Sequence, residues 1–291
     1  MQRIAFVGLG RMGEPMVANL LKQGFEVTIV GNRRPEPVER LRALGAKVAA
    51  TPAEAAAGAE VAILVLPTSA EVEATLTGPG GMADALAAGS VVVDCSTSEP
   101  DSTRKLAAHL AGRGVGFVDA GMTRGVVGAR QGKLAYFIGG SAEDFAKARP
   151  ALEAMGDTFF QMGPVGAGHE TKNLSNALSY GTVALVGEVL LLGKRFGLDL
   201  NALQEALMSG ASSKALESFG PRIIEREYSP ARVSVGNVRY HLQTTRDITP
   251  ETVSLELLPR VEAMYERLSG MGLADKDMSA LAELWERTDS A

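Results

Sequence analysis

Lys172, a side chain that could transfer a proton, lies in the middle of the chain, and the polar side chain of Asn176 follows four residues later. A glycine-rich turn, residues 163–168, precedes them, and an apolar segment that predicts one long helix continues to Phe196. Residues four positions apart in a helix share a face, so both side chains point the same way. The working hypothesis is that this helix joins two domains and carries a proton-transfer group. Such a group needs a cofactor site elsewhere in the chain.

The N-terminus contains a pattern that binds dinucleotides. An apolar strand, residues 3–7, leads into Gly8-x-Gly10-x-x-Gly13, and apolar residues then recur at helical spacing. Gly8 permits a tight turn, Gly10 lets the backbone approach a pyrophosphate, and Gly13 allows close packing of helix on strand. The N-terminus of the helix presents N–H groups and a positive dipole end to phosphates. The predicted cofactor loop comprises Gly8, Leu9, Gly10, Arg11, Met12 and Gly13.

The end of the second predicted strand, residues 26–30, bears on the choice of cofactor. Sites for NAD usually place Asp or Glu there to bind the ribose hydroxyls. This chain has Asn32, Arg33 and Arg34 instead, and guanidinium groups can hold the 2′-phosphate of NADP. We therefore predict NADP, with NAD as the less favoured cofactor; a solvated loop is the alternative interpretation of the two arginines. Residues that follow later strands are further predicted cofactor neighbours: Leu66, Pro67, Thr68 and Thr97.

Short apolar runs alternate with helical segments through the first half of the chain, which is typical of a doubly wound α/β sheet. The predicted strands are residues 3–7, 26–30, 46–49, 61–66, 91–94, 117–120, 134–139 and 158–162. Strand signals fade after residue 168, and helical periodicity replaces them. The prediction is a Rossmann-like α/β domain, residues 1–163, followed by an all-α domain, residues 164–291, entered through the long helix.

Composition excludes several classes of protein. The chain has 291 residues, 46% of them hydrophobic, and a net charge of −5, with no long basic run that would bind nucleic acid. A single cysteine, Cys95, excludes an intramolecular disulfide and a cysteine metal cluster, and no metal site is expected. The N-terminus lacks the layout of a signal peptide, so we expect a cytoplasmic protein with no membrane partner.

The long helix is apolar on more than one side, which requires several packing partners. We expect it to contribute to subunit contacts in a homodimer or homotetramer.

A second expectation concerns residues 121–129, a glycine-rich loop after the strand at 117–120. Such a loop can bind an anionic group through backbone N–H groups, the Thr123 hydroxyl and the Arg124 guanidinium.

Taken together, these patterns resemble the β-hydroxyacid dehydrogenases, the 3-hydroxyisobutyrate dehydrogenase superfamily, over nearly the whole chain. The resemblance is carried by Gly8–Gly13 with Asn19-Leu20-Leu21, by Asp119 through Ala129, by Gly163 through Asn176, and by Gly272, Asp275 and Ser279.

The resemblance implies NAD(P)-dependent oxidation of a small hydroxy acid, or reduction of the corresponding aldehyde acid. It implies that Lys172 is the general acid/base at the reacting oxygen and that Asn176 holds the substrate. A lysine suits that role when burial lowers its pKa. The resemblance also implies that residues Thr123, Arg124 and Gly125 bind the acid group of the substrate.

The chain departs from the family pattern at two places. In the loop usually written Asp-x-Pro-Val-Ser-Gly-Gly, Gly121 replaces proline, Thr123 replaces serine and Arg124 replaces glycine. A cation there leads us to expect a more strongly anionic substrate, such as a sulfonate, a phosphonate or a second carboxylate. Where the family has a late Lys-Asp pair, this chain has Tyr240 and His241, which are predicted to line the substrate site.

Two alternatives remain open from the sequence. An imine reductase or reductive aminase shares this architecture and favours NADPH, although such enzymes usually lack a lysine at the position of Lys172. A non-catalytic NADP-binding interaction module would be expected to lose that lysine.

Overall fold

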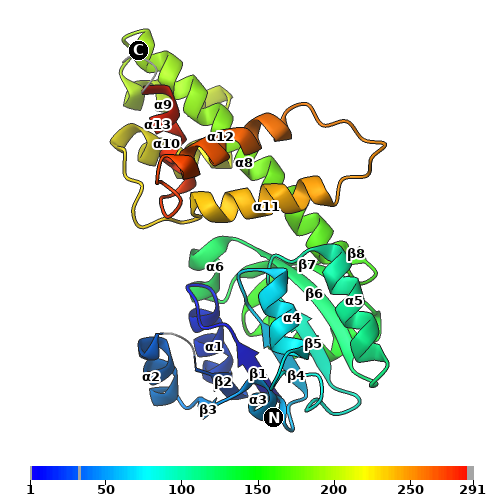
Figure 1. Ribbon diagram of the computed structural model, residues 1–291. Coiled ribbons are helices and arrows are strands. Elements are labelled where there is room, and N and C mark those ends of the chain that lie inside the picture. The colour runs from blue at the N-terminus through cyan, green and yellow to red at the C-terminus, as the bar shows by residue number, and fades with distance from the viewer. Residues whose placement is uncertain (1, 32–33, 287–291) are drawn as a thin grey trace. The chain divides into compact units, whose positions relative to one another are not determined.

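The computed structural model describes residues 2–31 and 34–286, which divide into two compact units, the first ending at Lys172 and the second beginning at Asn173. The first unit is a sheet with helices on both faces (Figure 1). Its strands are β1 Arg3–Val7, β2 Glu26–Val30, β3 Lys47–Ala49, β4 Val61–Leu64, β5 Val91–Asp94, β6 Gly116–Thr123, β7 Leu134–Gly140 and β8 Gly156–Gly163. Its helices are α1 Gly13–Lys22, α2 Pro35–Ala43, α3 Pro52–Ala56, α4 Ser69–Thr77, α5 Pro100–Ala111, α6 Gly125–Gln131 and α7 Ala142–Glu153.

The strand order is β3-β2-β1-β4-β5-β6-β7-β8. The first six strands are parallel, β7 is antiparallel to β6, and β8 is parallel to β7. This order is that of a doubly wound dinucleotide-binding sheet with two added strands at one edge. The predicted α/β fold followed by an all-helical region is confirmed.

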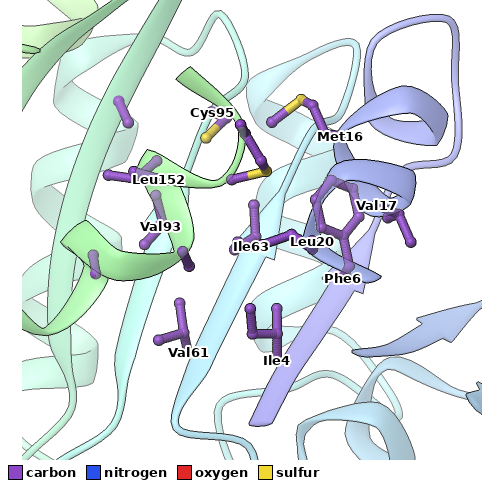
Figure 2. Packing of buried hydrophobic residues seen from close by; sticks show 14 of the residues in the cluster. Ile4, Phe6, Met16, Val17, Leu20, Val61, Ile63, Val93, Cys95 and Leu152 are labelled. Carbon is purple, nitrogen blue, oxygen red and sulfur yellow. The ribbon is translucent and has the colours of Figure 1, made fainter. Parts of the chain in front are cut away.

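The two faces of the sheet separate by the alternation of side chains along each strand. Ile4 and Phe6 of β1 point toward a core made with α1 and α7, whereas Ala5 and Val7 point toward a core made with α3, α4 and α5. Figure 2 shows Met16, Val17 and Leu20 of α1 near Phe6 and Ile63 of two strands, and Val93 of a third strand near Leu152 of α7. Both cores are buried, and their packing fixes the positions of the carboxyl ends of the strands.

The second unit consists of helices around one apolar core. Its elements are α8 Ala167–Arg195, whose first turns belong to the first unit, α9 Leu200–Gly210, α10 Lys214–Glu225, α11 Val235–Asp247, α12 Leu258–Gly270, η1 Met278–Ala282 and α13 Glu283–Glu286. Tyr180 and Val183 of α8 pack in this core with Val238 of α11 and Tyr265 of α12.

Two details differ from the sequence analysis. The predicted glycine-rich loop at 121–129 is wrong: β6 continues to Thr123 because Gly121, Met122 and Thr123 pair with β7, and α6 begins at Gly125. The compact units divide after Lys172, whereas the predicted domain boundary lay at 163/164. The first turn of α8 belongs with the sheet because Gly166 and His169 donate their N–H groups to the carboxylate of Asp119 on β6.

Close packing of that first turn depends on Gly168. A Cβ at this position would lie 2.4 Å from the Phe137 carbonyl oxygen and 2.6 Å from that of Asp119. We predict that Gly168→Ala destabilises the protein by roughly 1–3 kcal/mol or more, because backbone must move to admit the methyl group. The measurement is thermal unfolding followed by circular dichroism. The control is Gly270→Ala at the end of α12, where a Cβ has no described neighbour within 4 Å; equal melting temperatures for the two variants would contradict the packing argument.

Candidate active site

The loop between β1 and α1 has the stereochemistry that its three glycines predict. Gly8 has φ +108°, and a Cβ there would lie 2.1 Å from the Val65 carbonyl oxygen. A Cβ on Gly13 would lie 1.8 Å from the Gly8 carbonyl oxygen. Around Gly10, by contrast, no described atom lies within 4 Å of a Cβ position. Two glycines are therefore required by the turn itself, and the middle one leaves its backbone open to a ligand, as a dinucleotide site requires.

The other predicted residues of this loop lie in different environments. Leu9 is buried in the core, so only its backbone can face a ligand, whereas Arg11 is exposed and Met12 is half-buried. Glu14, in the first turn of α1, is paired with Arg40 of α2, and the hydrogen bond from Arg40 lowers the pKa of its carboxyl. These contacts tie the start of α1 to α2.

The predicted 2′-phosphate clamp is only partly within the described residues. Asn32 and Arg33 lie outside them. Arg34 is exposed at the N-cap position of α2, directly after the gap. Its charge contributes to lowering the pKa of Glu14, which places it near the start of α1. One predicted cation therefore lies beside the helix that follows the glycine loop.

The loops after β4 and β5 meet at the same edge of the sheet as Gly8. The N–H of Leu66 donates to the Ser96 hydroxyl at 2.9 Å, which joins the two loops. Pro67 is exposed, and Thr97 is half-buried. Thr68 forms a capping box with Glu71 at the start of α4, so its side chain already has a structural role.

Lys172 lies at the end of the first unit, on the side of α8 that packs on β6. A Cβ on Gly121 would lie 2.6 Å from the Lys172 Cβ, so the lysine stem lies directly on the strand. Burial lowers the Lys172 pKa from its usual value to about 8, because removing water disfavours the charged ammonium. Among the described residues no hydrogen bond or ion pair reaches this ammonium. A lysine in this state can both donate and accept a proton near neutral pH.

Two buried aspartates of the sheet hold the turn that carries Lys172, one through its carboxylate and the other through its backbone carbonyl oxygen. Asp119 accepts the Gly166 and His169 N–H groups, both at 2.8 Å. Asp94 of β5 accepts from the Ser96 N–H and the Ser98 hydroxyl, and its carbonyl oxygen lies 3.2 Å from the His169 Nε2. His169 is fully buried, so it anchors the helix. Sequence reasoning missed this anchor; its only signal was an aspartate inside each of two apolar strands.

Asn176, one turn after Lys172 in α8, is buried in the second unit. Its amide nitrogen Nδ2 has no hydrogen-bond partner among the described residues. A buried donor without a partner is unfavourable, so it is suited to bind a polar group that is supplied from outside the chain.

Tyr240 and His241 lie on α11 in the second unit. The His241 Nδ1 is 2.6 Å from the hydroxyl of Tyr180, and the two rings stack with centroids 5.9 Å apart. Burial raises the Tyr180 pKa, so its hydroxyl stays protonated. Tyr180 was not identified from the sequence, because nothing in the spacing of α8 and α11 predicts this pairing.

Arg124 does not point freely into solvent. Its guanidinium Nη1 donates to the Asp157 carboxylate at 2.6 Å and to the Lys133 carbonyl oxygen at 2.8 Å, and Nη2 donates to the Thr158 hydroxyl at 2.9 Å. On either side of it in the turn, Thr123 is half-buried and Gly125 is exposed. The structure thus places the three predicted acid-binding residues together, with the arginine side chain turned toward β8.

Comparison with known proteins agrees with this arrangement. Residues 3–163 match the family model of the NAD binding domain of 6-phosphogluconate dehydrogenase. Residues 166–285 match the model described as NAD-binding of NADP-dependent 3-hydroxyisobutyrate dehydrogenase. The fold and the glycine loop therefore define an NAD(P)-dependent oxidoreductase.

Individual relatives show which family of NAD(P)-dependent oxidoreductases the chain is similar to. An NAD-dependent L-serine dehydrogenase of Pseudomonas aeruginosa is 35% identical, and the match covers 99% of each chain. A 3-hydroxyisobutyrate dehydrogenase of the same organism is 40% identical over 76% of this chain and 74% of its own. The structure of Mycobacterium tuberculosis 3-hydroxyisobutyrate dehydrogenase with L-serine superposes with a TM-score of 0.87 at 27% identity, covering all of both chains. The chain belongs to the 3-hydroxyisobutyrate dehydrogenase superfamily of β-hydroxyacid dehydrogenases, which act on CH–OH groups.

Proposed function

We propose that this protein interconverts a small hydroxy acid and its aldehyde acid with NADP as the preferred cofactor, and that Lys172 is the general acid/base. The single observation that carries the proposal is Lys172, whose burial lowers its pKa to about 8, on the helix that packs against the dinucleotide-binding sheet. The open backbone at Gly10, between two sterically required glycines, supports the cofactor site.

When bound, the nicotinamide supplies or accepts the hydride at the substrate carbon. In reduction, Lys172 gives its proton to the oxygen that becomes an alkoxide. In oxidation, neutral Lys172 takes the hydroxyl proton. In the first unit, the Thr123 hydroxyl and Gly125 receive the acid group of the substrate. The resemblance to the family assigns further substrate contacts to Asn176, whose Nδ2 has no partner among the described residues, and to Tyr240 and His241.

The substrate class that we propose is a small anionic aldehyde acid, and the test is a screen of NADPH oxidation. The panel contains carboxylate, sulfonate and phosphonate aldehydes together with imines. Turnover of the aldehydes but not of the imines supports the proposal. Turnover of the imines alone would contradict it and would assign imine reduction to this protein instead. The cytoplasm remains our proposed location.

The role of Lys172 predicts a pH dependence that differs between the two directions. Reduction needs the protonated lysine, so kcat/KM should fall as pH rises through about 8. Oxidation needs the neutral lysine, so kcat/KM should rise through the same pH. Lys172→Ala should abolish both of these pH dependences and lower kcat by roughly 100- to 10,000-fold.

Two variants serve as controls for that measurement. Lys172→Arg keeps a cation that stays protonated, and it should fail as a base in oxidation. Lys105→Ala removes an exposed lysine from α5 and should change neither rate nor pH profile. Full activity of Lys172→Ala would overturn the mechanism.

Cofactor preference needs its own experiment, because the names of the matches include both NAD and NADP. If Arg33 and Arg34 hold the 2′-phosphate, each substitution by alanine should raise the KM for NADPH by roughly 10- to 100-fold, the effect of losing a charged hydrogen bond. The KM for NADH should stay unchanged. Arg42→Ala, at an exposed position on α2, is the matched control. An unchanged ratio of NADPH to NADH efficiency would count against the clamp.

We also propose that α8 forms a symmetric contact between two copies of the chain. Its large exposed apolar residues are Leu174, Leu178, Leu185, Leu192 and, just after the helix end, Phe196. These residues are spaced symmetrically along the chain about Leu185: Leu174 and Phe196 lie equally far from it in sequence, and so do Leu178 and Leu192. An antiparallel pairing about a two-fold axis at Leu185 would therefore match apolar residues throughout, which is the property of an isologous interface.

The length and hydropathy of α8 also satisfy the criteria for a membrane-spanning helix, but half of its most apolar window is buried inside the protein. A core helix of a globular domain passes the same test. The symmetric spacing of the five exposed apolar residues favours a second copy of the chain as the partner of this surface.

Leu185→Glu tests the interface, because it would place two carboxylates face to face at the symmetry axis. We expect the variant to sediment as a monomer, and the unmodified protein as a dimer or a larger even-numbered assembly, in analytical ultracentrifugation. Leu44→Glu, an equally exposed leucine beside α2, should leave the assembly intact. A dimeric Leu185→Glu variant, or association of the unmodified monomer with lipid vesicles instead, would contradict the proposed contact.

A further inference from the structure

Arg124 combines an unfavourable backbone conformation with an extensive set of side-chain contacts. Its φ of +75° is in the left-handed region, which only one other non-glycine residue, Arg226, adopts among the described residues. A residue with a Cβ adopts this conformation at a cost, and surrounding contacts must maintain it. At Arg124 those contacts are the three hydrogen bonds from its guanidinium to Asp157, Thr158 and Lys133.

The partner strand is shaped to receive this guanidinium. Along β7 and β8, Leu134 pairs with Gly156 and the next residue, Ala135, pairs with Thr158, so Asp157 is an extra residue in β8. Consecutive side chains of a regular strand point to opposite faces, whereas a bulge re-aims one of them. The bulge lets Asp157 and Thr158 contact the same guanidinium. Hydrogen bonds from Thr158 and Arg124 hold the pKa of the Asp157 carboxyl below its usual value.

The turn that Arg124 occupies connects parts of the proposed active site. It directly follows Thr123 at the end of β6, the strand on which the Lys172 stem lies at Gly121. It directly precedes α6, whose Ala129 carbonyl oxygen accepts the Asn19 amide of α1 at 2.7 Å. The helix α1 begins at the cofactor loop. A change in this turn would therefore reach the acid-binding residues, the lysine and the cofactor helix.

We propose that Arg124 is a positioning residue: its contacts with Asp157, Thr158 and Lys133 fix the β6–α6 turn, so that Thr123 and the strand beneath Lys172 are held in place for catalysis. The Arg124 side chain then acts on the substrate through the backbone. This inference rests on the proposed function, because it concerns the same site.

The competing assignment gives the guanidinium directly to an anionic substrate. The two differ in their expectation for Asp157, which has no part in binding an anion. If Arg124 positions the turn, loss of the Asp157 charge is harmful. If Arg124 binds the substrate, the same change frees the guanidinium and should leave the KM unchanged or lower it.

The kinetic experiment compares Arg124→Gln, Arg124→Lys, Asp157→Asn and the double variant Arg124→Gln/Asp157→Asn. Each is assayed with an aldehyde acid that the unmodified enzyme reduces and with the neutral methyl ester of that acid. We expect Arg124→Gln and Asp157→Asn each to lower kcat by roughly 10- to 100-fold, a loss typical of misplaced reacting groups. The factor should be the same for both substrates, the double variant should be no worse than the more damaged single one, and Arg124→Lys should recover part of the rate.

The control for this series is Arg149→Gln, which breaks the Arg149–Glu153 ion pair on α7 in the same unit. It should leave kcat unchanged. A loss in Arg124→Gln that appears in KM and only for the charged substrate, with full activity in Asp157→Asn, would overturn the positioning role.

A second measurement is independent of activity and keeps this inference separate from the proposed function. Hydrogen–deuterium exchange of the amides in residues 120–131 should be faster in Asp157→Asn than in the unmodified protein, at equal melting temperature. It should be unchanged in Arg149→Gln. Unaltered exchange in Asp157→Asn would refute the role of these contacts, whereas a lack of turnover with every aldehyde in the unmodified protein would refute the proposed reaction alone.

Discussion

The carboxylate of Asp119 is the constraint on which the first unit and its candidate site depend. It lies fully buried in β6 and accepts two N–H groups from the start of α8. The first N–H groups of a helix have no partners within the helix, and a buried carboxylate satisfies two of them while its charge is stabilised by the helix dipole. This interaction determines where α8 begins, and therefore where Lys172 lies along β6.

Close approach of backbone to backbone makes that interaction possible. Gly168 and Gly139 have no side chain where the first turn of α8 meets the strands, and a Cβ on Gly139 would lie 2.5 Å from an Asp119 oxygen. Gly121 has the same function beneath the Lys172 stem. Burial of the lysine on this strand lowers its pKa, because removing water disfavours the charged ammonium.

Arg124 illustrates how a side chain that the sequence assigns to a ligand can also have several partners within the fold. A cation in a turn that is expected to bind an acid suggests direct contact with an anion. An isolated exposed ion pair contributes little, but the bulge in β8 supplies a carboxylate and a hydroxyl, and Lys133 adds a carbonyl oxygen. Three acceptors match the planar, multiple-donor geometry of a guanidinium.

The sequence by itself determined the fold and the glycine loop. All eight predicted strands are present, because each is a short apolar run, and Gly8, Gly10 and Gly13 differ in their surroundings as their spacing predicts. The loop at 121–129 was mispredicted because pairing with β7 extends β6, and such pairing joins residues distant in the chain. For the same reason only the tertiary structure could show that Asp119 anchors α8, that Tyr180 pairs with His241, and that a bulge at Asp157 engages Arg124. Local periodicity determines elements, whereas contacts between distant side chains depend on register and approach, which no single segment encodes.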